Sequence, residues 1–345
     1  MAYTTIDKSS DYFNTVLYTG NGGNGHAITG VGFQPDWVWL KCRSSAHDHF
    51  LFDAVNGVKR FLSSNDNGDL ATADDSYLSV FGSDGFTLNN SDGMNESSQT
   101  FASWNWKANG SGSANTVGVI DSTVSVNATS GFTIVKWVAT DENTTIGHGL
   151  GVAPKVIIVK STTVTQPWIM GHGSLGFTKN LYLNQTDAEN TSATMWVNTA
   201  PTSTVFTTGT NDNVAQNGET FIAYCFSEVQ GFSKFGSYIG NGNADGSFVH
   251  TGFKPAWVMI KRASTAGDNW LIHDSKRNGY NGGNKQLDAD QANAEGDSRL
   301  IDMFSNGFKI IINDAKINAS GDTYIYMAFA ENPFVTSTGV PATAR

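Results

Sequence analysis

Apolar residues in this chain occur in short runs that are separated by clusters of Gly, Asn, Asp and Ser. Runs rich in Val, Ile, Thr, Phe and Trp predict β-strands, and the polar clusters predict the turns between them. Val156–Val159 is apolar at every position, which indicates a strand covered on both faces. Only the polar segment Asp288–Arg299 is compatible with a short helix. The pattern predicts an all-β protein.

One motif occurs three times, and it reads Gly-φ-x-Pro-x-φ-φ-φ-φ-Lys with φ an apolar residue. Its proline directly precedes a predicted strand, where the missing N–H costs no ladder hydrogen bond. An aromatic residue follows each lysine by eight or nine positions, at Phe50, Trp168 and Trp270. The three copies of the motif are Gly32–Lys41, Gly151–Lys160 and Gly252–Lys261.

A second block, aromatic at its first and last positions, also recurs three times, as Phe101–Trp106, Phe221–Phe226 and Tyr324–Phe329. A third block, Tyr18–Gly22, matches Tyr238–Gly242, whereas the middle copy has diverged to Trp137–Asp141. Copies so far apart are domains, because solenoid repeats are only about 20–45 residues long. We therefore predict three tandem homologous antiparallel β-sandwich domains, jelly-roll or concanavalin-like, at residues 1–115, 116–230 and 231–345.

Charge narrows the possible partners. The chain has 31 acidic and 21 basic residues and a net charge of −10, so we expect neither nucleic-acid binding nor an anionic membrane partner, since both need a basic face. No apolar run is long enough to insert into a membrane. Met1–Thr5 lacks the basic and apolar parts of a secretion signal, so we expect synthesis in a cytoplasm without Sec export. Two cysteines, Cys42 and Cys225, lie in apolar runs and are expected to be buried.

Candidate catalytic groups are sparse, and no common catalytic motif is present. His47 and His49 form the one close histidine pair, which could hold a metal but lacks an obvious third ligand. A glycosidase needs two carboxylates that flank a cleft, and Asp53, Asp274 and Glu228 are available for that role. We expect no enzyme, no catalytic residue and no cofactor.

Two further ligand hypotheses come from loops and tryptophans. Asn65–Asp69 is rich in oxygen ligands, so Asp66, Asp69 and Asp74 are candidates for binding Ca²⁺. The alternative is an ordinary turn, because Asn, Asp and Gly are also the common turn residues. Most of the nine tryptophans are expected in the core. Trp196 has no counterpart in the other copies and is the candidate for an exposed, glycan-binding indole.

The third copy carries a family resemblance. Gly231–Asn243, Thr251–Lys261, Tyr326–Phe334 and the tail Val340–Arg345 resemble a repeat family of marine tailed-bacteriophage proteins. The resemblance is close from residue 130 onward and looser in the first 115 residues, where Trp37–Lys41 still carries the pattern. Members resemble virion structural proteins of the tail-fibre, spike or head-associated kind. The family brings no catalytic residues.

The resemblance implies a virion component, made in the host cytoplasm and released by lysis. We expect a fibre-like or decorating protein on the particle exterior that mediates host-surface adhesion. Its partners would be other virion proteins and a host glycan or receptor. A homotrimer is the favoured assembly, although three homologous domains in one chain could themselves surround a pseudo-threefold axis. The alternatives are a soluble carbohydrate-binding lectin with exposed tryptophans and a glycan-degrading spike.

Overall fold

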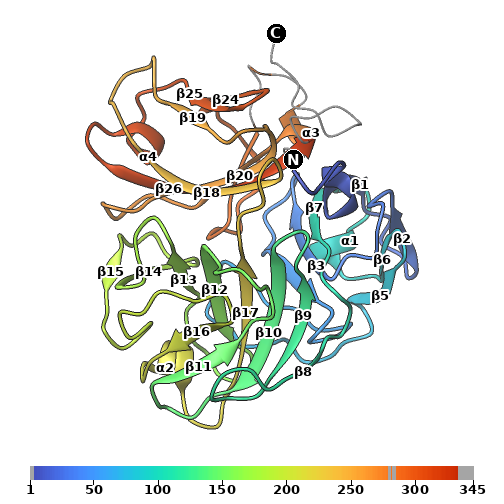
Figure 1. The fold of residues 1–345 in the computed structure, drawn as a ribbon. Coiled ribbons are helices and arrows are strands. Elements are labelled where there is room, and N and C mark those ends of the chain that lie inside the picture. The colour runs from blue at the N-terminus through green and yellow to red at the C-terminus, as the bar shows by residue number, and fades with distance from the viewer. Residues whose placement is uncertain (1–3, 279–280, 282–284, 333–345) are drawn as a thin grey trace.

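The computed structural model describes residues 4–278, 281 and 285–332, and most of its regular structure is β. Its named strands form antiparallel sheets, which confirms the predicted all-β sandwich fold. Figure 1 shows three groups of strands that follow one another along the chain, coloured blue to cyan, green to yellow and orange to red. We call these groups repeats 1, 2 and 3.

Repeat 1 consists of a main sheet and a small sheet. The main sheet has the order β1-β7-β3-β4, and the small sheet has the order β2-β6-β5. The strands of the main sheet are β1 (Phe13–Thr19), β7 (Thr100–Trp106), β3 (Trp37–Cys42) and β4 (Phe50–Asp53). Those of the small sheet are β2 (His26–Thr29), β6 (Gly85–Leu88) and β5 (Leu78–Gly82).

Repeat 2 keeps this order and extends it on both sides. Its main sheet has the order β15-β14-β13-β12-β17-β10-β9-β8, and its small sheet pairs β11 with β16. The counterparts of the repeat 1 main strands are β10 (Phe132–Val138), β17 (Thr220–Phe226), β12 (Val156–Ser161) and β13 (Ile169–His172). The other strands are β8 (Ser113–Asn115), β9 (Ser122–Asn127), β14 (Lys179–Tyr182), β15 (Asn190–Thr191), β11 (Thr144–Gly147) and β16 (Val205–Thr208).

Repeat 3 has a main sheet in the order β18-β26-β20-β21-β22-β23 and a small sheet in the order β19-β25-β24. Its main strands are β18 (Ser233–Ile239), β26 (Thr323–Asn332), β20 (Lys254–Arg262), β21 (Leu271–Asp274), β22 (Lys285–Asp288) and β23 (Gly296–Asp297). The small sheet contains β19 (Phe248–His250), β25 (Gly307–Ile310) and β24 (Ile301–Phe304).

Helices are single turns. Three of them stand at the same place, just before the strand that ends each repeat, and the fourth follows β21; a short 3₁₀ turn, Ser9–Asp11, precedes β1. The four helices of the described residues are α1 (Asp92–Asn95), α2 (Asp212–Ala215), α4 (Ala315–Asn318) and α3 (Ser275–Asn278). The helix considered for Asp288–Arg299 is wrong, because this segment contains the end of β22 and the short strand β23. Its polar residues lack the apolar stripe that would anchor a helix to the core.

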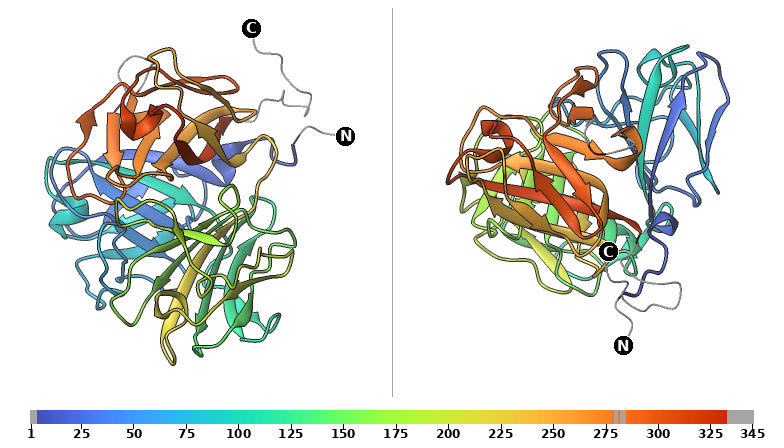
Figure 2. Two further views of the ribbon diagram at one scale, coloured as in Figure 1. Left: turned by 90° about the vertical axis from the view of Figure 1, so that its left-hand side faces the viewer. Right: turned by 90° about the horizontal axis from the view of Figure 1, so that it is seen from above.

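Each main sheet is covered on both faces. One face packs on the small sheet of its own repeat, and the other faces of the three main sheets share one core. Figures 1 and 2 show the three repeats grouped around this common centre. All six residues of β12 are buried, so the continuous apolar run Val156–Val159 has its physical reason in this double coverage.

Aromatic side chains from every repeat meet in the shared core. Trp37 of repeat 1 stacks on Tyr224 of repeat 2, with ring centroids 4.3 Å apart. Trp106 of repeat 1 meets Trp257 of repeat 3 edge-to-face at 5.7 Å. Phe226 and Phe329 close the third contact, between repeats 2 and 3, also at 5.7 Å. The repeats thus share their largest side chains, and the domain boundaries near residues 115 and 230 stay a prediction.

Candidate functional site

Three side chains at the same place in the repeats connect them inside the shared core. Asp53, His172 and Asp274 are the last residues of β4, β13 and β21, and each is at most 1% exposed. One atom of each side chain caps its own turn by accepting a backbone N–H, as Oδ1 of Asp53 does from Asn56 at 2.7 Å. Their other atoms bond across repeats: Tyr224 Oη donates to Asp53 Oδ2 (2.9 Å), Trp104 Nε1 donates to Asp274 Oδ2 (3.0 Å), and His172 Nε2 lies 3.3 Å from the carbonyl oxygen of Tyr326.

These contacts form a closed ring, because they join repeat 2 to 1, repeat 1 to 3 and repeat 3 to 2. Burial raises the pKa of Asp53, and Arg277 forms a buried ion pair with Asp274 at 2.5 Å. A polysaccharide cannot reach carboxylates at this depth. Asp53 and Asp274 therefore do not provide the accessible pair that the sequence offered for glycoside hydrolysis.

The lysine that ends the repeated motif forms a second ring. Lys41, Lys160 and Lys261 are fully buried. Each donates to a backbone carbonyl of another repeat, and the three acceptors stand at corresponding positions. The bonds run from Lys160 to Asn67 (2.9 Å), from Lys261 to Thr186 (3.1 Å) and from Lys41 to Ala292 (3.0 Å).

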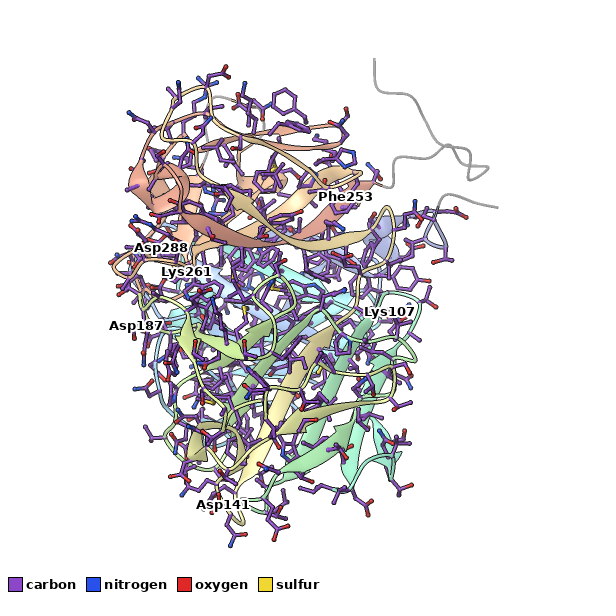
Figure 3. The ribbon with its side chains drawn as sticks, turned by 60° about the vertical axis from the view of Figure 1, so that its left-hand side comes forward. Lys107, Asp141, Asp187, Phe253, Lys261 and Asp288 are labelled. Atoms are coloured by element: carbon purple, nitrogen blue, oxygen red, sulfur yellow. The ribbon has the colours of Figure 1, made fainter. Side chains whose placement is uncertain are left out.

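Burial lowers the pKa of all three lysines to about 8, because a low-dielectric environment disfavours the charged amine. Nearby carboxylates act in the opposite direction, and for Lys160 these are Asp66 and Asp69. For Lys261 they include Asp187 of repeat 2, which Figure 3 shows on the same side of the molecule. For Lys160 and Lys261, carboxylates of a neighbouring repeat therefore offset part of the effect of burial.

A third ring of contacts between the repeats shows that the alignment of the strand starts made from the sequence must be corrected. By strand register, His49 occupies the place of Trp168 and Trp270, whereas Phe50 faces the core of its own sandwich. The prediction that Phe50 corresponds to the two tryptophans is thus wrong by one residue. Ring nitrogens of all three make a corresponding bond: His49 Nε2 to Asp288 O (3.0 Å), Trp168 Nε1 to Ser63 O (2.7 Å) and Trp270 Nε1 to Tyr182 O (2.9 Å).

The two histidines of the predicted pair, His47 and His49, have different partners in the structure. His49 lies between Trp39 Nε1, at 2.7 Å, and a repeat 3 carbonyl, and its burial lowers its pKa well below the ordinary value. His47 instead lies 3.0 Å from a carboxylate oxygen of Glu96. Among the described residues, no three His, Cys, Asp or Glu side chains converge as metal ligands.

Two of the three candidate calcium residues, Asp66 and Asp74, hold local turns. Asp66 Oδ1 accepts the backbone N–H of Gly68 at 2.5 Å, and Asp74 Oδ1 accepts that of Ser76 at 2.7 Å. Asp69 is exposed. A Ca²⁺ ion beside Asp66 and Asp69 would also be repelled by the Lys160 ammonium, with which these two carboxylates already interact electrostatically. The geometry favours the turn reading of this loop.

Trp196 is not exposed. Only 1% of this residue is accessible, and its indole packs edge-to-face on Phe177 at 5.9 Å. The prediction that Trp196 offers a surface for a sugar is therefore wrong. All nine tryptophans are in fact buried, as are Cys42 and Cys225, which confirms their assignment to the core.

One exposed aromatic pair is not among the residues that the sequence singles out. Phe248 on β19 is 47% exposed and Phe304 on β24 is 41% exposed, with ring centroids 6.0 Å apart. Ala27 and Gly82 occupy the corresponding places of repeat 1. Neither phenylalanine stands out in the sequence, because both belong to strands with an ordinary alternation of apolar and polar residues. Only the register of the small sheet reveals that the two side chains share a surface.

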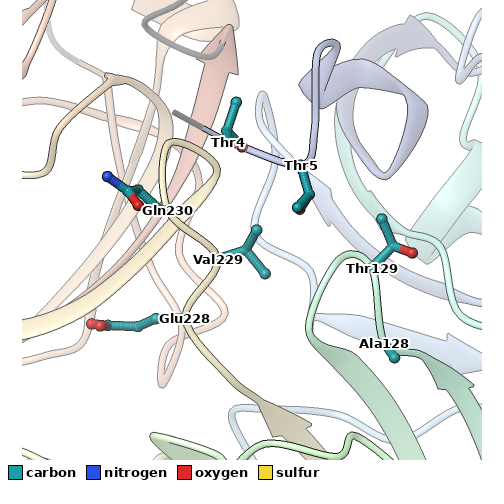
Figure 4. A pocket seen from close by; sticks show the side chains of 7 residues that line it. All are labelled: Thr4, Thr5, Ala128, Thr129, Glu228, Val229 and Gln230. Carbon is teal, nitrogen blue, oxygen red and sulfur yellow. The ribbon is translucent and has the colours of Figure 1, made fainter. Parts of the chain in front are cut away.

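Two surface hollows lie where repeats meet. The first, of about 540 Å³, lies between the N-terminal segment, the β9–β10 turn and the β17–β18 linker (Figure 4). Its Glu228, the third candidate carboxylate, is already engaged by Lys234 Nζ at 3.2 Å and by the N–H of Phe235 at 2.9 Å. The second, of about 270 Å³, lies between β1, the end of β26 and α3.

Comparisons with known proteins give one match. The model of a family described as a domain of unknown function, DUF7483, matches residues 8–333. No curated protein matches the chain. No solved structure matches it either. Within the described residues, none of the helices has the length and apolar character needed to cross a membrane.

Proposed function

This chain belongs to the DUF7483 family, and from its architecture we propose that it is a structural component of a tailed-phage virion. It would lie on the particle exterior as a fibre-like or decorating protein and mediate adhesion to the host surface. The observation that carries this proposal is the set of three buried rings of polar contacts that tie the repeats to one another.

Buried, hydrogen-bonded networks favour one arrangement of the elements around them, because any other arrangement would leave polar groups unpaired. Here the networks fix three β-sandwiches relative to one another through their most buried residues. A body of fixed shape is what a virion component needs when it acts by shape and by many weak contacts. Avidity then turns such contacts into stable attachment, since each particle displays many copies.

The test is gold-labelled antibody against this chain on purified particles of the phage that encodes it, viewed by electron microscopy. Label on the tail supports an adsorption fibre, and label over the head supports a decorating protein. Protein that stays free in the lysate with unlabelled particles contradicts the virion proposal. Deleting the gene is expected to reduce adsorption or particle stability, and no change in either would also contradict it.

A soluble lectin is the second candidate, and the exposed Phe248–Phe304 pair favours it. Aromatic rings on a surface offer flat apolar faces for a ligand ring. The exposed tryptophans expected of a lectin from the sequence are not found, because all the indoles are buried. Sugar binding by protein found only outside the particles, lost in Phe248→Ser, would support this candidate.

The homotrimer favoured from the sequence stays a prediction. The inner faces of the three main sheets already pack on one another within one chain. A trimer of chains would therefore have to use outer surfaces, and sedimentation mass separates a 37.0 kDa monomer from three times that mass.

A further inference from the structure

The contact between repeats 1 and 3 differs from the other two in its place along the chain. Repeat 2 directly follows repeat 1 and repeat 3 directly follows repeat 2, but the whole of repeat 2 separates repeats 1 and 3. The lysine bonds run in one direction around the molecule, from repeat 2 to 1, from 1 to 3 and from 3 to 2. A head-to-tail contact of this kind either closes into a ring or continues through further copies. The chain therefore needs a feature that makes repeat 3 meet repeat 1 and no other repeat.

A ring of backbone hydrogen bonds identifies the corresponding positions at the three contacts. The acceptor is in each case the carbonyl oxygen two residues after the buried lysine of the repeated motif, and the donor is a backbone N–H of the neighbouring repeat. The residues at the acceptor positions correspond to one another, and so do those at the donor positions. The three bonds run from Leu70 to Thr162 (3.3 Å), from Glu189 to Ala263 (2.7 Å) and from Glu295 to Arg43 (2.8 Å).

Of these three places, only the one between repeats 1 and 3 has an ion pair across the contact. Arg43 Nε donates to Glu295 Oε2 at 2.6 Å, and Arg43 Nη2 donates to Glu295 Oε1 at 3.1 Å. The side chain of Glu295 is 6% exposed and that of Arg43 is 20% exposed. At the other two places the acceptor residue is an uncharged threonine or alanine, and Glu189 pairs with Lys179 of its own repeat.

Arg277 and Asp274 extend this ion pair into a network of four charges. Arg277 Nη1 lies 3.6 Å from Glu295 Oε2, and Arg277 Nε donates to Asp274 Oδ2 at 2.5 Å. The guanidinium of Arg277 also lies 5.6 Å from the ring centroid of Trp104 in repeat 1. The side chains of Arg277 and Asp274 are fully buried. Two cations and two anions are thus gathered at the contact that closes the ring.

We propose that the Arg43–Glu295 pair decides which repeats meet, because it forms only when repeat 3 lies against repeat 1. A buried ion pair adds little net stability compared with apolar residues, but a charge left without its partner at a buried contact is strongly destabilising. Repeat 3 placed against the Thr162 surface of repeat 2 would leave Glu295 without a partner. The Leu70 loop of a second copy, placed against repeat 1, would leave Arg43 without one. The pair therefore excludes wrong contacts within one chain and between two copies.

The test gives this contact the uncharged residues found between repeats 1 and 2, in the double variant Arg43→Thr, Glu295→Leu. Parent and variant are unfolded in urea and refolded at about 1 to 50 μM, the range in which partly folded chains associate. Sedimentation velocity then compares the mass of each protein before unfolding and after refolding. We expect the parent to return to its original mass. The double variant should give a heavier fraction that grows with concentration and exceeds that of the parent at least about tenfold.

Glu189→Leu is the matched control, because Glu189 occupies the corresponding place between repeats 2 and 3 but pairs within its own repeat. It should refold like the parent. Glu295→Leu alone leaves Arg43 without its partner, so its thermal midpoint should lie about 4–7 °C below that of the double variant.

Glu295→Gln keeps the side-chain shape and is measured beside Glu189→Gln, in case the double variant does not fold. A heavier fraction that appears in the Glu295 variants and not in the Glu189 variants supports the proposal. Refolded masses that are the same in both sets overturn it. Equal thermal midpoints of Glu295→Leu and the double variant would also overturn it, because the single change would then leave no costly charge behind.

Discussion

Asn318 shows at the scale of one residue how a buried side chain holds a repeated loop. Its Nδ2 donates to Asn241 Oδ1 (3.1 Å), to Asn243 O (2.7 Å) and to Ile312 O (2.8 Å), while its Oδ1 accepts from Asn241 N (2.9 Å). The tight Gly-Asn-Gly turn of the third block is therefore built around one amide. Repeat 1 has the same arrangement at its own turn.

The divergence of the middle copy has its reason here. Thr140 replaces the turn asparagine in repeat 2, and Ala215 replaces the buried asparagine that would bond to it. Both partners are absent together, so neither is left buried without a hydrogen bond. The positive φ of the turn is kept by Asp141, at 55°.

We expect Asn318→Ala to lower the free energy of unfolding by about 2–3 kcal/mol, because it removes four hydrogen bonds and leaves buried partners unpaired. The measurement is urea denaturation followed by far-UV circular dichroism. Asn143→Ala is the control, since Asn143 is an exposed asparagine in the corresponding loop of repeat 2. Equal stability of the two variants would contradict this role of the amide.

A second prediction at the scale of one residue concerns His172. Burial lowers its pKa to about 4, whereas an unfolded histidine has a pKa near 6.5. As the pH falls, the unfolded state therefore binds the extra proton before the folded state does. The contribution of His172 to stability is complete above pH 6.5 and is lost as the pH falls toward 4. The shift corresponds to about 3 kcal/mol for this one group.

We expect His172→Gln to be less stable than the parent at pH 7 but to lose less stability between pH 7 and pH 4. The comparison of how the free energy of unfolding depends on pH in the parent and in the variant separates the contribution of His172 from that of Asp290. The pKa of Asp290 is raised to about 6, so its contribution to stability changes with pH in the opposite direction. His250→Gln, at an exposed position, serves as the control and should keep the parent slope. A parent-like slope in His172→Gln would sink the prediction.

At the scale of elements, the central strands do two tasks with one sequence motif. The four apolar positions of Val156–Val159 are buried on both faces of β12, and Lys160 at its end bonds to the neighbouring repeat. The repeated motif was predictable from the chain as a strand. From the sequence alone, the lysine of this motif would be placed on the surface, because only the tertiary arrangement brings a loop of another repeat over it.

We expect Lys160→Met to destabilise the protein by about 2–3 kcal/mol, since the carbonyls of Asn67 and Gln166 each lose a buried donor. The loss should be smaller near pH 7 than near pH 9. The lysine pKa of about 8 means that the charged form is disfavoured by folding, so the parent gains stability as the pH rises from 8 toward 10.5.

Lys155→Met is the matched control, because Lys155 precedes the same strand and is exposed. Thermal and urea unfolding at both pH values provide the comparison. If Lys160→Met and Lys155→Met change stability equally, the buried lysine has no role in joining the repeats.

At the scale of the whole molecule, the three repeats depend on one core. Trp257 and Phe329 of repeat 3 pack on Trp106 of repeat 1, and Phe329 also contacts Phe226 of repeat 2. A repeat taken alone would expose this apolar face to water, and large exposed apolar patches promote association. The tandem sandwiches therefore behave as parts of one body.

We expect residues 231–345 expressed alone to be poorly folded or aggregated, although they contain a complete sandwich. Near-UV circular dichroism and sedimentation velocity measure this, with the intact chain as the reference. A soluble monomeric fragment with a near-UV spectrum typical of packed aromatics would show that the repeat folds independently. The intact chain should unfold in one transition, with equal calorimetric and van 't Hoff enthalpies.

The sequence by itself determined the all-β class, the threefold repetition and the burial of the cysteines and most tryptophans. These follow from local alternation, turn residues and hydrophobicity, which act between neighbours along the chain. Tertiary structure alone decided that Trp196 is buried, that His49 takes the place of a tryptophan and that Asp53 and Asp274 bond across repeats. The physical reason is that a side chain's partners come from another repeat, between 75 and 251 positions away, and no local pattern records which face of a sheet that repeat will cover.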